Sequence, residues 1–267
     1  MICERVQLSE NNNVYLDTYV VANQAERIRD AILVIPGGGY AAVCSDREGE
    51  PIAMAFAARG INAFVLTYSI GEGAVYPRQL LDAASAMVYI KSNAERYHIN
   101  PERIFGVGFS AGGHLLGELT VHHDVAEEIM NLEKDYLKLA GSVFSYPVIT
   151  AQTKTHVASF ENLLKKSYDK ITEKERRFHS IECNVDESTP PAFIWHTSED
   201  KGVPFDGSLR LALAYKDAGI PVELHVYPKG PHGLALANEI TAKSSKGLIY
   251  PNVQEWIDKA VKWISEI

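Results

Sequence analysis

The 267-residue sequence has no long hydrophobic run, few cysteines and no excess of positive charge. No stretch approaches the roughly 18 apolar residues that a membrane-spanning helix needs. Residues 1–13 lack the apolar centre of a secretory signal peptide. The net charge of −8 disfavours nucleic acid and anionic membranes as partners. We therefore expect a cytoplasmic protein that binds neither nucleic acid nor membranes.

The three cysteines, Cys3, Cys44 and Cys183, are odd in number and far apart. This spacing fits neither a disulfide framework nor a metal-binding knuckle, and it is typical of a reducing compartment. The run His122-His123-Asp124 could hold a metal, but adjacent residues on a helix do not face each other. We therefore expect no metal site and no cofactor.

Strand and helix patterns alternate along the chain, whose composition is 46% apolar and 22% charged. This alternation predicts right-handed βαβ units and hence an α/β fold, with helices on both faces of a twisted, mostly parallel sheet. We expect one domain over residues 1–267, with residues 150–188 as a cap-like helical insertion between late strands. An N-terminal hairpin is expected at residues 6–8 and 14–21, around the turn-forming run Asn11-Asn12-Asn13. Strands are predicted at residues 31–35, 61–68, 103–107, 139–146, 191–196 and 222–227, and helices at 50–59, 79–97, 205–218 and 252–267.

The most informative stretch is Gly108-Phe109-Ser110-Ala111-Gly112, which follows a short apolar strand and precedes a helical segment. In this context the pattern G-x-S-x-G is typical of a nucleophile elbow. The sharp turn leaves no room for side chains on either side of the serine, so glycine is needed there. The elbow would expose the Ser110 hydroxyl at a helix N-terminus, where developing negative charge is favoured.

The same residues allow a second interpretation. Residues 106–111 also fit the G-x-G-x-x-A turn of dinucleotide-binding proteins, with Glu127 and Glu128 near the offset of a ribose-binding acid. However, Asp200 and His232 each lie in a loop after a late predicted strand, which gives the chain order Ser, Asp, His of α/β-hydrolases. A dinucleotide turn requires neither residue, and we therefore favour the elbow.

His114 is a competing candidate for the catalytic base, because it lies four residues after Ser110 on the same side of the predicted helix. A side chain one turn further along that helix lies beneath the elbow, however, and not above the hydroxyl. We therefore expect His114 to be a structural residue.

Several motifs together resemble the small bacterial serine esterases of the acetyl esterase and acetylxylan esterase branch. The similarity covers nearly the whole chain from residue 30 onward. Its motifs are Pro36-Gly37-Gly38-Gly39-Tyr40, residues 108–114, the run 190–197 with Asp200, Val203 and Pro204, Gly230-Pro231-His232-Gly233, and Ser159–Leu164 in the insertion. Related hormone-sensitive-type esterases carry histidine where this chain has Pro36. Pro36 therefore indicates a different subfamily and not a different mechanism, because the backbone N–H groups expected in the oxyanion hole do not depend on the side chain at position 36.

The resemblance implies roles that fit the chemistry of the residues. Ser110 attacks the ester carbonyl, His232 takes and later returns the proton, and Asp200 orients the histidine. Glu199 is the alternative to Asp200, although Asp200 has the matching spacing to Val203-Pro204.

Two further groups of site residues are expected. The oxyanion hole should be formed by the backbone N–H groups of Ala111, Gly38 and Gly39. Aromatic residues at strand ends or in the insertion are candidates for the substrate pocket, namely Tyr40, Tyr68, Tyr146 and Phe160.

The sequence therefore predicts a cofactor-free serine carboxylesterase that hydrolyses short acyl esters, acetate above all, of sugars or xylo-oligosaccharides. Two alternatives stay open: a peptidase or amide hydrolase with the same triad, and a non-catalytic ligand sensor on a hydrolase scaffold. The exposed aromatic residues of the insertion also leave a homodimer open.

Overall fold

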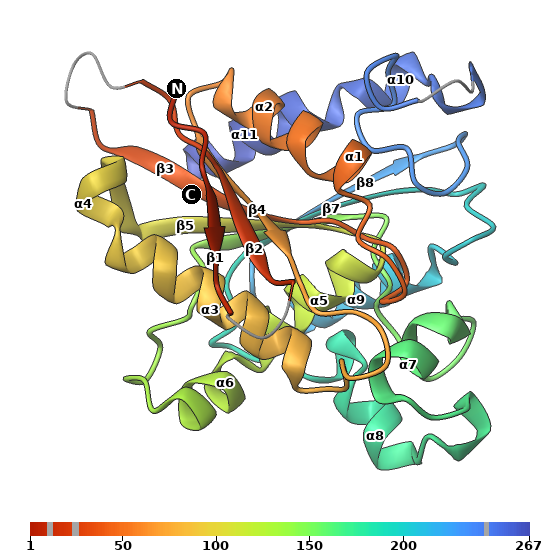
Figure 1. The fold of residues 1–267 in the computed structure, drawn as a ribbon. Coiled ribbons are helices and arrows are strands. Elements are labelled where there is room, and N and C mark those ends of the chain that lie inside the picture. Colours follow the sequence, from red (N-terminus) through yellow and green to blue (C-terminus); the bar gives the residue numbers. More distant parts are fainter. Residues whose placement is uncertain (10–12, 23–26, 243–245) are drawn as a thin grey trace.

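The computed structural model describes residues 1–9, 13–22, 27–242 and 246–267 (Figure 1). Within these ranges, eight strands form one sheet in the order β1-β2-β4-β3-β5-β6-β7-β8. The β1–β2 and β2–β4 pairs are antiparallel and the other pairs are parallel. The strands are β1 (Arg5–Gln7), β2 (Tyr15–Tyr19), β3 (Arg29–Ile35), β4 (Asn62–Thr67), β5 (Ile99–Phe109), β6 (Gly141–Ser145), β7 (Ala192–Thr197) and β8 (Val222–Tyr227).

Helices cover both faces of the sheet (Figure 1). One face packs against α2 and α11, and the other against α3, α5 and α9. The helices are α1 (Ser45–Glu48), α2 (Glu50–Ala57), α3 (Arg78–Ser92), α4 (Ala94–Tyr97), α5 (Ala111–Val121), α6 (His123–Met130), α7 (Val157–Leu164), α8 (Glu173–Phe178), α9 (Asp206–Asp217), α10 (Pro251–Gln254) and α11 (Trp256–Glu266), with 3-10 turns η1 (Tyr168–Lys170), η2 (Ile181–Cys183) and η3 (Lys246–Leu248). None of the described helices is long and apolar enough to cross a membrane.

Strand β3 shows why the buried parts of the central strands are mainly apolar. Ile32 and Val34 belong to the core under α2 and α11, whereas Leu33 and Ile35 belong to the core on the opposite face. Because successive side chains point to opposite faces, a strand with helices on both sides favours apolar residues at consecutive buried positions. The predicted α/β-hydrolase fold, with its mostly parallel sheet, is confirmed.

The structure differs from the predicted elements mainly at element ends. The helix expected over residues 79–97 is broken at Asn93, whose side-chain amide donates to the Tyr89 carbonyl at 2.9 Å and competes with the helical hydrogen bonds. The C-terminal helix is likewise divided into α10 and α11. The N-terminal hairpin is present as the β1–β2 pair, while Asn11 and Asn12 of its expected turn lie outside the described residues.

Residues 150–188 connect β6 to β7 and contain α7, η1, α8 and η2. In Figure 1, α7 and α8 lie together beyond the ends of α5 and α9. The segment is attached to α5 by close packing, because a Cβ on Gly117 would lie 2.7 Å from Ile181. His122 at the end of α5 also stacks on Phe178, with 4.1 Å between ring centroids. The end of the insertion is therefore held near the helix that follows Ser110.

Candidate active site

Ser110 occupies a sharp turn between β5 and α5. Its backbone has φ 52° and ψ −120°, a conformation that non-glycine residues rarely adopt. A Cβ on Gly108 would lie 2.5 Å from the carbonyl oxygen of Gly112, and one on Gly112 would lie 2.2 Å from the carbonyl oxygen of Ile35. The flanking positions must therefore be glycine for the serine to take this conformation.

The structure brings Ser110, Asp200 and His232 together. The Nε2 atom of His232 is 2.8 Å from Ser110 Oγ, and its Nδ1 atom is 2.6 Å from Asp200 Oδ2. These residues follow the parallel strands β5, β7 and β8, whose carboxyl ends share one edge of the sheet. Because the carboxylate can only accept, Nδ1–H donates to Asp200 and Nε2 is left to accept from the Ser110 hydroxyl.

Asp200 is held in its charged form by several donors. Its Oδ1 atom accepts from the N–H groups of Gly202 and Val203, at 2.8 and 2.9 Å. His196 donates through Nε2 to Oδ2 at 3.1 Å, in addition to the bond from His232. Burial opposes ionisation, but the hydrogen bonds from the two histidines outweigh it and hold the pKa of Asp200 well below its usual range.

Glu199 and His114, the alternative candidates for the orienting acid and the catalytic base, have other partners. The Glu199 carboxylate lies 3.4 Å from the N–H of Gly230. His114 is fully buried, donates through Nε2 to the carbonyl of His179 and accepts at Nδ1 from the Tyr40 hydroxyl. Burial lowers the pKa of His114. It is Asp200 and His232, therefore, that form the chain of hydrogen bonds to Ser110.

The glycine loop after β3 lies beside the serine. A Cβ on Gly37 would be only 2.8 Å from the Cβ of Ser110, and Gly38 and Gly39 have φ values of 131° and 64°. Within the described part of the chain, the N–H groups of Gly38 and Gly39 have no protein acceptor. Ala111 is the first residue of α5, so its N–H also lacks a partner within the helix. These three N–H groups are available to bind an oxyanion.

A buried carboxylate that the sequence analysis missed supports this loop. Glu48 is 1% exposed and accepts from the N–H of Gly37 at 2.8 Å and from the Tyr146 hydroxyl at 2.9 Å. The Tyr146 hydroxyl in turn accepts from the N–H of Ala235 at 2.9 Å, and its ring packs against His232. Glu48 therefore links the glycine loop to the histidine loop.

Arg47, the neighbouring residue, makes a parallel connection. Its guanidinium donates to the carbonyl of Gly233 at 3.1 Å, directly beside the histidine. No local pattern marks Arg47 or Glu48 in the sequence, because their partners lie up to 186 residues away.

The four aromatic residues expected to line a substrate pocket are buried in the two cores, Tyr146 on one face of the sheet and the other three on the opposite face. All are at most 2% exposed. Tyr40 and Tyr146 have positive φ values, and their hydroxyls bond to the buried side chains of His114 and Glu48. Tyr68 donates to the carbonyl of Pro36 at 3.0 Å, and Phe160 packs edge-on against His114. None of them is among the residues that line the cavity at the serine.

That cavity, called here the Ser110 cavity, has a volume of about 330 Å³. The insertion forms one of its walls, and the glycine loop and the histidine form others. Its lining residues are Gly38, Gly39, Ala41, Arg47, Glu48, Ser110, His156, Ala158, Asn162 and His232.

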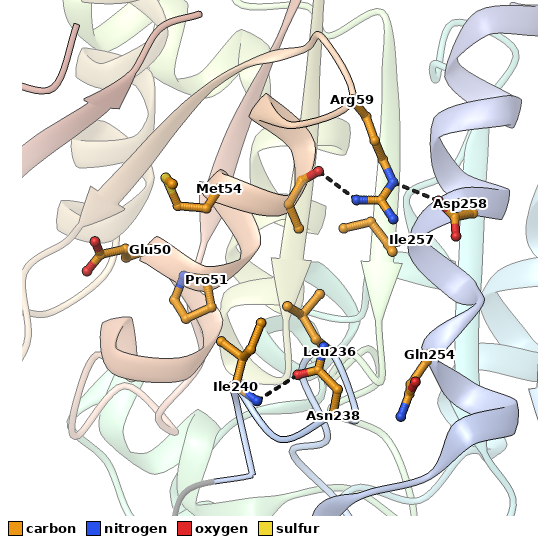
Figure 2. A pocket seen from close by; sticks show the side chains of 11 residues that line it. Glu50, Pro51, Met54, Arg59, Leu236, Asn238, Ile240, Gln254, Ile257 and Asp258 are labelled. Atoms are coloured by element: carbon orange, nitrogen blue, oxygen red, sulfur yellow. Dashed lines mark hydrogen bonds and ion pairs between the residues drawn. The ribbon is translucent and has the colours of Figure 1, made fainter. Parts of the chain in front are cut away.

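A second hollow, called here the α2 groove, lies between α2, the 236–240 segment and the C-terminal helices (Figure 2). Its volume is about 650 Å³, and it is lined by Glu50, Pro51, Met54, Ala55, Arg59, Leu236, Asn238, Ile240, Gln254, Ile257 and Asp258. Figure 2 shows Arg59 bonded to Asp258 and to a backbone carbonyl, that of Ala55.

Comparison with known proteins connects this geometry to a family. The sequence model of the BD-FAE family matches residues 16–215. The chain belongs to the BD-FAE family. This is a family of α/β-hydrolase esterases, which agrees with the strand order and with the turn at Ser110.

Three relatives of this BD-FAE protein, all from bacteria, illustrate the similarity. An endo-1,4-β-xylanase B of Butyrivibrio fibrisolvens is 40% identical over 218 residues, which is 79% of this chain and 33% of that protein. An acetylxylan esterase of Xylanibacter ruminicola is 27% identical over 85% of this chain and 45% of its own length. The chain thus spans less than half the length of these two relatives. An acetyl ester-xyloside bifunctional hydrolase from Caldicellulosiruptor lactoaceticus has a crystal structure that is similar over 98% of this chain and 96% of its own, with a TM-score of 0.84 and 31% identity.

Proposed function

We propose that this chain is a carboxylesterase that removes short acyl groups, above all acetyl groups, from sugars such as xylo-oligosaccharides. One observation carries the proposal: Ser110 Oγ lies 2.8 Å from His232 Nε2, and His232 Nδ1 lies 2.6 Å from Asp200. Membership of an esterase family supports the reaction type. The acetylxylan esterase and the acetyl ester-xyloside hydrolase among its relatives support the substrate class.

In the first half of the reaction, Ser110 Oγ attacks the ester carbonyl carbon while its proton passes to His232 Nε2. The carbonyl oxygen becomes an oxyanion, which the N–H groups of Gly38, Gly39 and Ala111 stabilise. His232 then donates the proton to the alcohol oxygen, the C–O bond breaks, and the alcohol leaves. The acyl group stays on Ser110 as an ester.

The second half repeats these steps with water as the nucleophile. Water gives a proton to His232 and attacks the acyl carbon, and His232 returns that proton to Ser110 as the carboxylic acid leaves. Asp200 stabilises the imidazolium that forms in each half, because its charge is fixed by four hydrogen bonds. It also holds His232 in the tautomer that accepts from the serine.

The dimensions of the Ser110 cavity support a short acyl group. Its volume of about 330 Å³ is at the low end for small-molecule sites. Both the acyl group and part of the alcohol must fit there. The sugar specificity therefore depends on which polar groups line the walls.

The proposal is tested with the p-nitrophenyl esters of acetate, butyrate and octanoate, using the wild type and Ser110→Ala. We expect acetate to be hydrolysed fastest and Ser110→Ala to lower kcat by at least about 10⁴-fold. A fluorophosphonate probe should label the wild type and leave the variant unlabelled, which would exclude a non-catalytic sensor. No hydrolysis by pure wild type, or full activity in the variant, would contradict the proposal. Faster turnover of aminoacyl arylamides than of esters would favour the amide hydrolase.

A further inference from the structure

The insertion contributes one histidine to the wall of the Ser110 cavity. His156 is the residue before α7, and it lines the cavity together with Ser110 and His232. Its Cε1 atom lies 3.6 Å from the position that a Cβ on Gly39 would take, so the ring faces the oxyanion loop. Burial, reinforced by repulsion from His232, lowers the pKa of His156. The ring is therefore neutral at pH 7, and one of its two nitrogens carries a proton.

The hydrogen bond to Ser159 indicates which nitrogen of the His156 ring carries the proton. His156 Nδ1 is 2.8 Å from Ser159 Oγ. Ser159 is 1% exposed, and among the described residues its hydroxyl has no other acceptor. A buried hydroxyl normally donates its hydrogen. Ser159 therefore donates to Nδ1, and Nε2 carries the proton of the neutral ring.

His156 Nε2–H is a donor without a partner in the described part of the chain. The hydrogen bonds of Ser110 and Asp200 go to His232, His196 and backbone N–H groups, and none of them joins His156. His156 is thus placed to contact the substrate and not to transfer the catalytic proton.

Asn162, six residues after His156 and within α7, adds an acceptor to the same wall. Its Nδ2 atom donates to the carbonyl of Gly39 at 2.8 Å, which fixes the side-chain amide. The Oδ1 atom has no hydrogen-bond donor among the described residues, and Asn162 also lines the cavity. The wall formed by α7 therefore offers one donor and one acceptor.

We propose that His156 and Asn162 bind a free hydroxyl group on the carbon next to the ester, so that the preferred substrates are partly acetylated sugars with a vicinal hydroxyl. The hydroxyl oxygen accepts from His156 Nε2–H, and its hydrogen is donated to Asn162 Oδ1. The ester oxygen must lie near His232 Nε2 to receive the proton, and a vicinal hydroxyl is its nearest neighbour in a sugar ring. This inference rests on the proposed function and adds a specificity determinant to it.

The test compares two substrates that differ by one hydroxyl group, a methyl 2-O-acetyl-β-xyloside and its 3-deoxy analogue. The measured quantity is the ratio of their kcat/KM values. In the wild type this ratio should favour the hydroxylated substrate by about tenfold or more. His156→Phe keeps a ring of similar size without the donor, and it should lower the ratio about tenfold. His156→Gln can place an amide donor near the Nε2 position, and it should retain part of the preference.

His225→Phe is the matched control, because His225 is a half-buried histidine on β8 outside the Ser110 cavity. It should leave the ratio and both rates unchanged. An equal loss of rate on both substrates in His156→Phe, with the ratio intact, would overturn the inference and leave His156 a structural residue. A wild-type ratio near one would also overturn it while leaving the esterase proposal intact, provided that p-nitrophenyl acetate is hydrolysed. Failure on p-nitrophenyl acetate would contradict both proposals.

Discussion

The Ser110 cavity and the α2 groove differ in both size and chemistry. The groove is about twice as large, at about 650 Å³ against about 330 Å³. Its residues include no serine, cysteine or histidine, and its arginine, Arg59, is paired with Asp258 at 2.7 Å. The smaller cavity contains a serine in a strained turn, two histidines and unpaired backbone donors.

The difference follows from the topology of the sheet. The carboxyl ends of parallel strands bring loops from distant parts of the chain to one place, so polar groups converge there. The α2 groove lies between helices on one face of the sheet, where the residues serve mainly to cover the core. Of these two hollows, it is therefore the smaller one that contains the serine hydrogen-bonded to a histidine.

The largest effect is expected from Asp200→Asn. The asparagine keeps the shape of the side chain but can hold His232 in the wrong tautomer, so kcat should fall by about 10⁴-fold. Glu199→Gln is the matched control on the adjacent residue, and it should retain activity within about threefold because Glu199 bonds only weakly to Gly230. The measurement is steady-state hydrolysis of p-nitrophenyl acetate. Equal losses in the two variants would contradict the assignment of Asp200.

A smaller effect is expected from Glu48→Ala, which tests the link between the glycine and histidine loops. The change leaves the N–H of Gly37 and the hydroxyl of Tyr146 without their partner. Complete loss of one oxyanion donor costs about 100- to 1000-fold in rate, so a displaced loop should lower kcat by about 10- to 100-fold with little change in KM.

Glu50→Ala is the control for this variant, because Glu50 is exposed, lies two residues further along and lines the α2 groove instead. It should have no effect on kcat. Glu48→Gln should restore much of the activity, since its amide oxygen can still accept from Gly37. Thermal melting of each variant separates loss of fold from loss of alignment. A raised KM with unchanged kcat would argue against a role for Glu48 in positioning the oxyanion loop.

The smallest effect concerns stability in acid. The pKa of Asp200 lies below its ordinary value of 3.8, so the carboxylate stabilises the folded state fully above that value. This contribution is lost as the pH falls below 3.8 towards the folded pKa. The urea midpoint of the wild type should therefore drop more between pH 5.5 and 2.5 than that of Asp200→Asn, which cannot titrate. Parallel curves would show that Asp200 adds no acid-dependent stability.

Features that depend on local contacts could be predicted from the sequence. The glycines around Ser110 are set by contacts within the turn and with the neighbouring strand end, and the apolar strands by their two buried faces. The long α3 helix was extended too far because its apolar spacing continues past Asn93, where a polar side chain ends it.

Features that depend on distant contacts could not be predicted. Asn162 bonds to a residue 123 positions away, and Glu48 to Tyr146, 98 positions away. The positions of Tyr40 and Tyr146 at strand ends suggested a pocket, but their hydroxyls bond to buried partners instead. Both residues also have a positive φ, which is rare for a tyrosine and could not be predicted from the sequence. The residues of the proposed triad could thus be predicted from the sequence more readily than the residues that line the cavity around them.

The strained conformation of Ser110 has an evolutionary consequence. A residue held at φ 52° costs about 1–3 kcal/mol relative to a relaxed backbone, and glycine would adopt the same turn more easily. Selection for thermal stability alone would therefore replace this serine. Its presence means that the chain carries a permanent trade-off, in which tolerance to further destabilising mutations is reduced in exchange for a serine hydroxyl at the proposed active site.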